Sequence, residues 1–445
     1  MNSKVSVIGL GYVGLSTAVC FASRRIKTIG VEVNKEKLST IRSGIVPFHE
    51  RGLDEMLRQT LDDGTFDCTD DISKAVRNTE ITIIAVGTPS RPDGGIELDF
   101  VREACAQVAL AMKAKRRNHI VVIKSTVVPG TTEEMIKREL ESRSGMKAVR
   151  DFGLAVNPEF LREGTAVYDT FHPDALILGC SDGRTLSTLK KLFQKFYGKL
   201  PVTIETTPTN AELIKYSVNT FRAVQLSFIN TLANLASALP NSEVGEVIRG
   251  LATITKLDNR YLRPGPGFGG SCLPKDTRAM IAHMRNKGVD PDILESALKI
   301  NMKQSKVIVN TAESLLKTLK GRKIAVLGLS FKGNTDDIRE SPSLNIVREL
   351  LLRGAAVSAY DPAAGENAKN ILGDSISLSN DAKDCLHEAD CCIIATEWTE
   401  FSKLKPEDFA SIMKEPVIVD ARRIFDPEKF GKGGVIYRRI GTSIE

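Results

Sequence analysis

The sequence has no apolar run long enough to cross a bilayer. Its longest apolar stretches, such as 81–86 and 391–395, fall far short of the roughly 18 residues that a membrane-spanning helix needs. Glycine and proline recur without a fixed period, which excludes a collagen-like fibre. The eight cysteines form no CxxC pair and the five histidines show no spacing typical of metal ligands, so no metal site is expected.

A marked excess of one charge sign is also missing. Lys and Arg together number 61 and Asp and Glu 55, and a net charge of +6 on such a mixed surface argues against a nucleic-acid partner. The composition, 42% hydrophobic and 26% charged, is that of an ordinary globular chain, and 445 residues suggest roughly three domains. The first eight residues form a strand pattern without the layout of a signal peptide, so we expect a soluble cytoplasmic protein.

Residues 1–206 alternate between strand-like and helix-like patterns. Short apolar strands are predicted at 4–8, 28–33, 81–86, 120–124, 154–156 and 175–178. Because helical patterns separate the first strands, this βαβ rhythm predicts a parallel sheet with helices on both faces.

Residues 208–239 have a different pattern, without glycine or proline after Pro208. Apolar side chains cover nearly the whole circumference, which predicts one buried helix of roughly 45 Å that a second subunit could also cover. Thr207 and Pro208 are suited to begin this helix, and Thr209 with Glu212 resembles a capping box. Two shorter core helices are the alternative.

Residues 322–445 return to the α/β pattern. Ser330 replaces the middle glycine of the loop at 328–333, so we assign this loop no dinucleotide, although its Lys332 would suit a nucleotide phosphate. Asp361, at the end of the next strand, is interpreted as a solvated acid. The predicted fold is α/β: two doubly wound Rossmann-like domains, 1–206 and 319–445, joined by a long central helix and a small helical domain at 207–318.

The segment after the first predicted strand has the pattern GxGxxG. Gly9, Gly11 and Gly14 permit a tight turn, close approach of a pyrophosphate and close packing of the following helix, whose N–H groups face the phosphates. Glu32 ends the next strand, where an acid accepts hydrogen bonds from a ribose diol and favours NAD over NADP. Lys37 lies nearby and keeps NADP open, and a purely structural turn is the alternative.

The stretch at 265–276, GPGFGGSCLPKD, is the most informative part of the sequence. Glycines beside Cys272 let the backbone approach a ligand closely. Lys275 can lower the pKa of the thiol, and Asp276 can orient a base or a water molecule. A glycine-rich turn with an unreactive thiol is the alternative.

Two further polar groups are candidates for the site. Lys215 and Asn219 are four residues apart and share one face of the predicted long helix, where they suit a developing oxyanion. The alternative is a polar stripe facing solvent. The segment 157–164 places acids and a base after a strand, where α/β proteins bind ligands, although a surface charge pair is equally compatible. The same edge is expected to carry Thr88, Ser125 and Thr126.

Seven segments, in order from residue 9 to residue 343, resemble the UDP-glucose/GDP-mannose dehydrogenase family. They read GLGYVGLS, VGTPS, KSTVVPGTT, NPEFLREGTA, NAELIKYSVNT, GFGGSCLPKDTRAM and GLSFKGNTDDIRESPS, and DARRIFD near residue 420 extends the match. The resemblance covers essentially the whole chain.

This resemblance implies an enzyme that oxidises the primary alcohol of a nucleotide sugar to a carboxylate, with two NAD per turnover and no release of the aldehyde. Cys272 would attack the aldehyde to form a thiohemiacetal, which is oxidised to a thioester and then hydrolysed. Lys215 and Asn219 would stabilise the successive oxyanions.

The resemblance also implies the other roles at the site. Asp276 and Thr126 would position or activate water, and Glu159 would act as an acid or base near the thioester. The implied cofactor residues are Gly9, Gly11, Tyr12, Val13, Gly14, Glu32, Lys37, Thr88, Ser125, Glu163, Lys275 and Arg339. The implied substrate residues are Phe160, Leu161, Arg162, Lys215, Asn219, Tyr261, Phe268, Gly269, Phe331, Lys332 and Arg422. In this family the long helix pairs two subunits, so a homodimer is expected.

Some positions depart from the family pattern. Glu32 stands for the usual Asp and Ala175 for a usual Arg, and the short segment 256–263 leaves open whether Arg260 or Arg263 reaches a neighbouring subunit. UDP-glucose is the expected substrate, and GDP-mannose or a UDP-N-acetylhexosamine is the alternative within the family, although NPEFLREG argues against the N-acetylhexosamine branch. Remoter alternatives are a single-oxidation hydroxy-acid dehydrogenase and a non-catalytic nucleotide-sugar binder.

Overall fold

The computed structural model describes residues 4–115, 118–257 and 259–443. It divides into two compact units, Met1–Val218 (the first unit) and Asn219–Glu445 (the second unit), each of which is described by itself. The division into three domains stays a prediction. Within the described ranges, no helix is both long and apolar enough to span a membrane.

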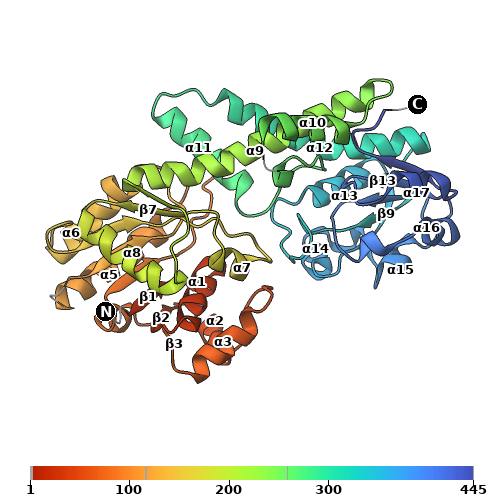
Figure 1. Cartoon of the computed structure of the whole chain (residues 1–445). Helices are drawn as coiled ribbons and strands as arrows, with labels where there is room; N and C mark the ends of the chain where they lie inside the picture. The colour runs from red at the N-terminus through yellow and green to blue at the C-terminus, as the bar shows by residue number, and fades with distance from the viewer. Residues whose placement is uncertain (1–3, 116–117, 258, 444–445) are drawn as a thin grey trace. The chain divides into compact units, whose positions relative to one another are not determined.

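The first unit is built on an eight-stranded sheet with the strand order β3-β2-β1-β4-β5-β6-β7-β8 (Figure 1). Its strands are β1 (Val5–Ile8), β2 (Thr28–Val31), β3 (Phe66–Thr69), β4 (Ile81–Ile84), β5 (Ile120–Ile123), β6 (Gly153–Val156), β7 (Leu176–Cys180) and β8 (Thr203–Thr206). Strands β1 to β6 run parallel as predicted, but β7 pairs with β6 in the antiparallel sense. Strands β3 and β8 were not predicted, because each has charged or polar residues at alternate positions.

Helices cover both faces of this sheet, because successive strand residues point to opposite sides. Val5 and Val7 belong to one apolar cluster, whereas Ile8 belongs to the other. The first cluster includes residues of α1 (Tyr12–Ser23), α2 (Lys35–Arg42), α3 (Leu53–Asp62) and α8 (Gly183–Tyr197), with α7 (Ala166–Phe171) packed against it. The second includes residues of α4 (Ile72–Arg77), α5 (Asp99–Lys115) and α6 (Lys137–Ser144), which directly follows a π-helical turn, η1 (Thr132–Ile136).

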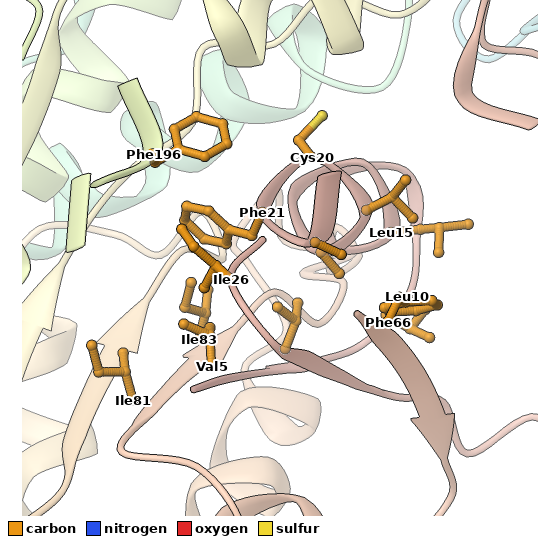
Figure 2. Close-up of a cluster of buried hydrophobic side chains, with 14 of the residues drawn as sticks. Val5, Leu10, Leu15, Cys20, Phe21, Ile26, Phe66, Ile81, Ile83 and Phe196 are labelled. Atoms are coloured by element: carbon orange, nitrogen blue, oxygen red, sulfur yellow. The ribbon is translucent and has the colours of Figure 1, made fainter. Parts of the chain in front are cut away.

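Helix α1 is held on the sheet by aromatic packing. The Phe21 ring meets Phe196 of α8 edge-on, with 4.8 Å between ring centroids. Figure 2 shows Phe21 and Ile26 above Val5 and Ile83 of the strands. All of these side chains are buried. This packing holds the last turn of α1 on the sheet, while the first turn of the helix follows the glycine turn after β1.

Helix α9 (Pro208–Ala238) is one continuous helix, as predicted (Figure 1). The Thr207 hydroxyl accepts a hydrogen bond from Asn210 N at 3.2 Å, so Thr207 caps the helix as expected. The capping-box interpretation is wrong, because the Glu212 carboxylate instead accepts hydrogen bonds from Gly130 N and Thr132 N. These donors belong to a turn about 80 residues away, which local spacing could not indicate.

One side of α9 is not buried within the chain. Ala223, Ile229 and Ala233 are enclosed, but Phe221, Phe228 and Leu235 are each about half exposed. The exposed side chains are seven residues apart, so they form one stripe along the helix. The prediction of burial all round therefore holds for the opposite side only.

The second unit combines helices with a second sheet. After α9 come α10 (Val244–Thr255), the short helix η2 (Asn259–Tyr261), α11 (Leu273–Asn286) and α12 (Asp292–Leu316). The six-stranded sheet is parallel, with the order β11-β10-β9-β12-β13-β14. Its strands are β9 (Lys323–Leu327), β10 (Ala356–Tyr360), β11 (Ser377–Leu378), β12 (Cys391–Ile394), β13 (Val417–Asp420) and β14 (Ile436–Arg439). Its helices are α13 (Pro342–Leu352), α14 (Gly365–Leu372), α15 (Ala382–Leu386), α16 (Pro406–Ile412) and α17 (Pro427–Lys432). The prediction of a second doubly wound sheet is confirmed.

Asp361 is not the solvated acid that the sequence suggested. It is buried, and its carboxylate accepts hydrogen bonds from Leu329 N at 2.7 Å, Ser330 N at 2.9 Å and the Ser330 hydroxyl at 2.8 Å. The Trp398 indole donates to the same oxygen at 3.1 Å. The buried N–H groups of the loop after β9 need acceptors, and Asp361 supplies them.

We expect Phe21→Ala to reduce the free energy of unfolding by about 3–5 kcal/mol, because it leaves a cavity between α1 and the sheet. Urea unfolding followed by circular dichroism measures the change. Leu110→Ala on α5 is the matched control, since Leu110 is 55% exposed. An equal effect of the two substitutions would contradict the packing described here.

Candidate active site

The glycine turn of the first unit combines two packed glycines with one that borders open space. Gly9 has a φ of +89°, and a Cβ at Gly14 would lie 1.8 Å from the Gly9 carbonyl oxygen, so neither position tolerates a side chain. A Cβ at Gly11 would meet no atom within 4 Å. Tyr12 begins α1, so this space lies at a helix N-terminus, which fits a pyrophosphate.

Glu32 follows β2 and is 8% exposed. Its carboxylate accepts a hydrogen bond from Asn34 N at 3.1 Å and pairs with Lys37 Nζ at 3.1 Å. Lys37 is thus held by Glu32, which favours an uncharged ribose diol over a ribose phosphate. These contacts fit the expected NAD.

The Tyr12 hydroxyl connects the glycine turn to the loop after β6. It donates to Glu50 and accepts from Gly164 N at 2.6 Å, while Glu50 also accepts from Val167 N at 3.3 Å. Burial and the nearby Glu50 carboxylate raise the pKa of Tyr12. Sequence reasoning did not assign Glu50 a role, because its partners are distant in sequence.

Glu159 and Lys215 form a buried ion pair. Lys215 Nζ donates to Glu159 Oε1 at 2.8 Å and to the Glu159 carbonyl oxygen at 2.6 Å, and Leu161 N donates to Glu159 Oε2 at 2.6 Å. Burial acts to raise the pKa of Glu159, but the Lys215 charge and hydrogen bond more than offset it, so the pKa is lowered. The pair therefore presents a carboxylate and an ammonium group, with Lys215 Nζ 5.1 Å from the Phe160 ring centroid.

Asp169, which sequence reasoning missed, shapes the loop that carries Arg162. The Arg162 guanidinium donates to both carboxylate oxygens of Asp169, at 2.6 and 3.1 Å, and Arg162 N donates at 2.9 Å. The guanidinium is thus engaged within the protein. In the sequence, the only sign of this pair is that Asp169 lies seven residues after Arg162, in the next short helix.

The predicted residues of the first unit share the carboxyl edge of the parallel strands. Ser125 follows β5 and its hydroxyl donates to Val86 O at 2.7 Å. The segment after β1 carries Gly9 to Gly14, including Val13, and the segment after β2 carries Glu32 and Lys37. Thr88 follows β4, Ser125 and Thr126 follow β5, and Glu159 to Glu163 follow β6. These strand ends are adjacent in the sheet, as the sequence predicted.

In the second unit, Cys272 caps the N-terminus of α11 and is exposed. Its Sγ lies 3.4 Å from the Ser271 hydroxyl, and Asp276 N donates to the Cys272 carbonyl oxygen at 2.8 Å. The N–H groups and dipole of a helix N-terminus stabilise a thiolate. This placement suits a nucleophile.

Asp276 is 1% exposed and accepts two hydrogen bonds. Asn219 Nδ2 donates at 2.7 Å and Lys275 Nζ at 2.6 Å. The ammonium group of Lys275 is therefore directed to Asp276. The structure brings three of the predicted residues together one turn beyond Cys272.

The glycine loop before Cys272 packs on the loop after β9. A Cβ at Gly269 would lie 2.3 Å from the Glu340 carbonyl oxygen, and Gly270 N donates to Arg339 O at 2.8 Å. Phe268 is fixed through its backbone N and O by the Asn301 side chain, a residue that sequence reasoning missed. The glycines thus serve close packing of two loops.

The remaining predicted substrate residues of the second unit occupy turns near the carboxyl edge of its sheet or lie beside α9. The Arg422 guanidinium donates to Ala395 O at 2.8 Å and Phe331 O at 2.9 Å. Lys332 Nζ lies 5.6 Å from the Phe331 ring centroid. Tyr261 in η2 stacks under the Arg222 guanidinium at 4.6 Å. Arg339, which was predicted as a cofactor residue, pairs through its guanidinium with Asp337 at 2.8 Å.

Three family models match the chain in order. They are the NAD-binding domain (residues 3–197), the central domain (209–303) and the UDP-binding domain (325–427) of the UDP-glucose/GDP-mannose dehydrogenase family. The UDP-glucose 6-dehydrogenase TuaD of Bacillus subtilis (strain 168) is 34% identical over 438 residues, covering 98% of this chain and 93% of that protein. The chain belongs to the UDP-glucose/GDP-mannose dehydrogenase family.

Solved structures of other proteins agree with this assignment. A UDP-glucose dehydrogenase from Pyrobaculum islandicum superposes with a TM-score of 0.88 at 37% identity over 96% of both chains. A UDP-D-ManNAc dehydrogenase from Pyrococcus horikoshii superposes with a TM-score of 0.85 at 30% identity, covering 98% of this chain and 99% of that one.

Family membership decides the general chemistry. The protein is an oxidoreductase that uses NAD and acts on a nucleotide sugar. The glycine turn, the helix start at Tyr12 and Glu32 are the observed features of the NAD-binding domain that fit this cofactor. Across the described residues, no group of three or more His, Cys, Asp or Glu side chains is placed to hold a metal ion.

We expect Gly11→Ala and Gly14→Ala to fail in different ways. The Gly11→Ala variant keeps its stability but binds NAD at least about tenfold more weakly, because the methyl group enters the phosphate space. The Gly14→Ala variant loses about 1–3 kcal/mol of stability, because its methyl group overlaps the Gly9 carbonyl. Thermal unfolding and NAD titration by calorimetry distinguish the two, and a Gly11→Ala variant with unchanged NAD affinity would contradict this assignment.

Proposed function

We propose that the enzyme oxidises UDP-glucose to UDP-glucuronate with two NAD per turnover, through a covalent intermediate on Cys272. The observation that carries this proposal is an exposed thiol at the N-terminus of α11, followed one turn later by the buried Asp276. A dehydrogenase that made only an aldehyde or ketone would need no such thiol.

NAD, when bound, accepts one hydride in each of the two oxidations. Between them, the Cys272 thiolate adds to the carbonyl carbon of the aldehyde and forms a thiohemiacetal alkoxide. Loss of hydride from this carbon leaves a thioester, with no change in the C–S bond. Water then attacks the thioester and the C–S bond breaks. One proton of the water passes to the departing sulfur and the other to solvent, which leaves the carboxylate and the Cys272 thiol.

Negative charge appears on the substrate oxygen during these steps, and Lys215 and Asn219 are proposed to stabilise it. Lys215 provides an ammonium group that Glu159 fixes in position. Asn219 provides an amide whose orientation Asp276 fixes. Preorganised donors of this kind stabilise an oxyanion without reorganising during the reaction.

The proposal gives the hydrolytic water to Asp276 and Thr126, and acid–base chemistry near the thioester to Glu159. Glu159 is ionised in its resting state and can therefore accept a proton. Phe160, Leu161 and Arg162 would contact the substrate from one loop. Because Asp169 engages the Arg162 guanidinium, we propose that Arg162 contacts the substrate through its backbone.

Nucleotide recognition is proposed for the second unit. Lys332 supplies a cation for a phosphate, and Arg422 orders the turn after β9 through Phe331 O. Tyr261, Phe268 and Gly269 would contact the sugar nucleotide. UDP-glucose is preferred because TuaD and the Pyrobaculum islandicum protein are named for it, with GDP-mannose as the alternative.

We expect two NADH per molecule of UDP-glucose consumed, measured by absorbance at limiting sugar nucleotide. Cys272→Ala should abolish carboxylate formation, since no thioester can form. Parallel assays with GDP-mannose and UDP-N-acetylmannosamine test the substrate choice. One NADH per sugar, or nearly normal turnover of the Cys272→Ala variant, would refute the covalent mechanism and favour a single oxidation.

We also propose a homodimer paired through α9. Besides the stripe of Phe221, Phe228 and Leu235, the next helix, α10, carries the exposed apolar side chains of Val247 (45% exposed) and Ile254 (83% exposed). Exposed apolar surface of this extent is typical of a protein interface. In a twofold-symmetric dimer, the same stripe of a second copy would pack against this one and remove its apolar side chains from water.

We expect the double variant Phe221→Asp/Phe228→Asp to sediment as a monomer while the wild-type chain sediments as a dimer, because charge in an apolar interface is costly. Analytical ultracentrifugation gives the masses. Leu352→Asp, which changes a leucine that is 82% exposed on α13, serves as control and should stay dimeric. A dimeric double variant would place the interface elsewhere.

A further inference from the structure

Lys124 lies at the carboxyl end of β5, one residue after the strand, and has no role in the scheme above. Its backbone N donates to Ile84 O of β4 at 2.8 Å. Its ammonium group donates to Asn157 Oδ1 at 3.1 Å, and Asn157 Nδ2 donates to Ile177 O of β7 at 2.9 Å. Three neighbouring elements therefore fix the position of this ammonium group.

The bond to Asn157 places Lys124 against the loop that carries Glu159 two residues later, and Lys215 of α9 donates to Glu159 at 2.8 Å. The charges of both groups act on Lys124. The cluster thus holds two ammonium groups and one carboxylate in a largely buried place. Burial and, to a smaller extent, the Lys215 charge lower the pKa of Lys124 to about 8, against the opposing effect of the Glu159 carboxylate. Lys124 is charged at neutral pH and loses its charge as the pH rises through about 8.

The proposed reaction places conflicting demands on Lys215. It balances the buried Glu159 carboxylate in the resting enzyme, and it is assigned to a second anion when the substrate oxygen becomes negative. A buried carboxylate that loses part of its partner becomes costly. A second cation beside Glu159 removes this conflict.

We propose that Lys124 is a positioning residue, whose ammonium group keeps Glu159 ionised while Lys215 serves the substrate oxygen. It acts through Glu159 and Lys215 and need not touch the substrate. The inference rests on the proposed function, since it assumes that Lys215 stabilises the oxyanion.

The test compares Lys124→Met and Lys124→Arg with the wild-type enzyme between pH 6.5 and 9.5. We expect kcat of Lys124→Met to be about tenfold below wild type at pH 7, where the lost charge matters, with KM little changed. The ratio of the wild-type kcat to the Lys124→Met kcat should fall toward one above pH 8, because the wild-type lysine then loses its proton. Lys124→Arg keeps its charge and should retain activity at pH 9.5 better than wild type does.

Other groups that titrate in this range are common to the wild type and both variants, so their effects on kcat cancel when the ratio of two enzymes is taken at each pH. Lys113→Met, which changes an exposed lysine on α5, is the control and should match wild type throughout. A ratio that stays constant from pH 6.5 to 9.5 would overturn the proposal and indicate a structural role only. If Lys124→Met does not fold, by circular dichroism, a Lys124→Arg profile that declines at high pH as the wild type does would overturn it.

The stoichiometry assay separates this inference from the proposed function. Two NADH per sugar together with pH-independent ratios would refute the role of Lys124 alone. Absence of turnover by the wild-type enzyme with all three sugar nucleotides would refute the proposed function and the inference with it.

Discussion

The parallel register of β1, β4, β5 and β6 is the constraint on which the first unit depends. Residues 5–8 pair with 81–84, these with 120–123, and these with 153–156, so the strands end at one level. Each following turn then places its polar residues at the same edge. The backbone hydrogen bonds of the sheet thus bring the glycine turn, Ser125, Lys124 and Glu159 to the same edge.

Several buried carboxylates at this edge are each paired with a specific cation. Glu159 is paired with Lys215, Glu32 with Lys37 and Arg162 with Asp169. The same principle operates in the second unit, where Asp276 is held by Asn219 and Lys275. Such pairs contribute little net stability, but they fix side-chain orientation, which is what a catalytic oxygen or ammonium group requires.

The two sheets use similar loops differently. In the first unit, the turn after β1 leaves space at Gly11, and Glu32 at the end of β2 turns to Asn34 and Lys37. In the second unit, Asp361 at the end of β10 turns back and binds the N–H groups of the loop after β9. The N–H groups of the loop after β9 are therefore already bonded to Asp361. This agrees with assigning the dinucleotide to the first sheet alone.

The sequence by itself determined the α/β class, the two largely parallel sheets, the long helix and the glycine turn, but not the antiparallel pairing of β7 with β6. These features arise from periodicity and backbone sterics, which act over a few residues, as at Gly9 and Gly14. Ordered motifs also determined the family. Only the tertiary structure decided that Glu212 binds a distant turn and that Asp361 is buried. It also decided that Asp169 engages Arg162, that Glu50 accepts from Tyr12 and that Lys124 donates to Asn157. These partners are separated by up to about 117 residues, and such contacts depend on how strands and loops are brought together by the whole fold.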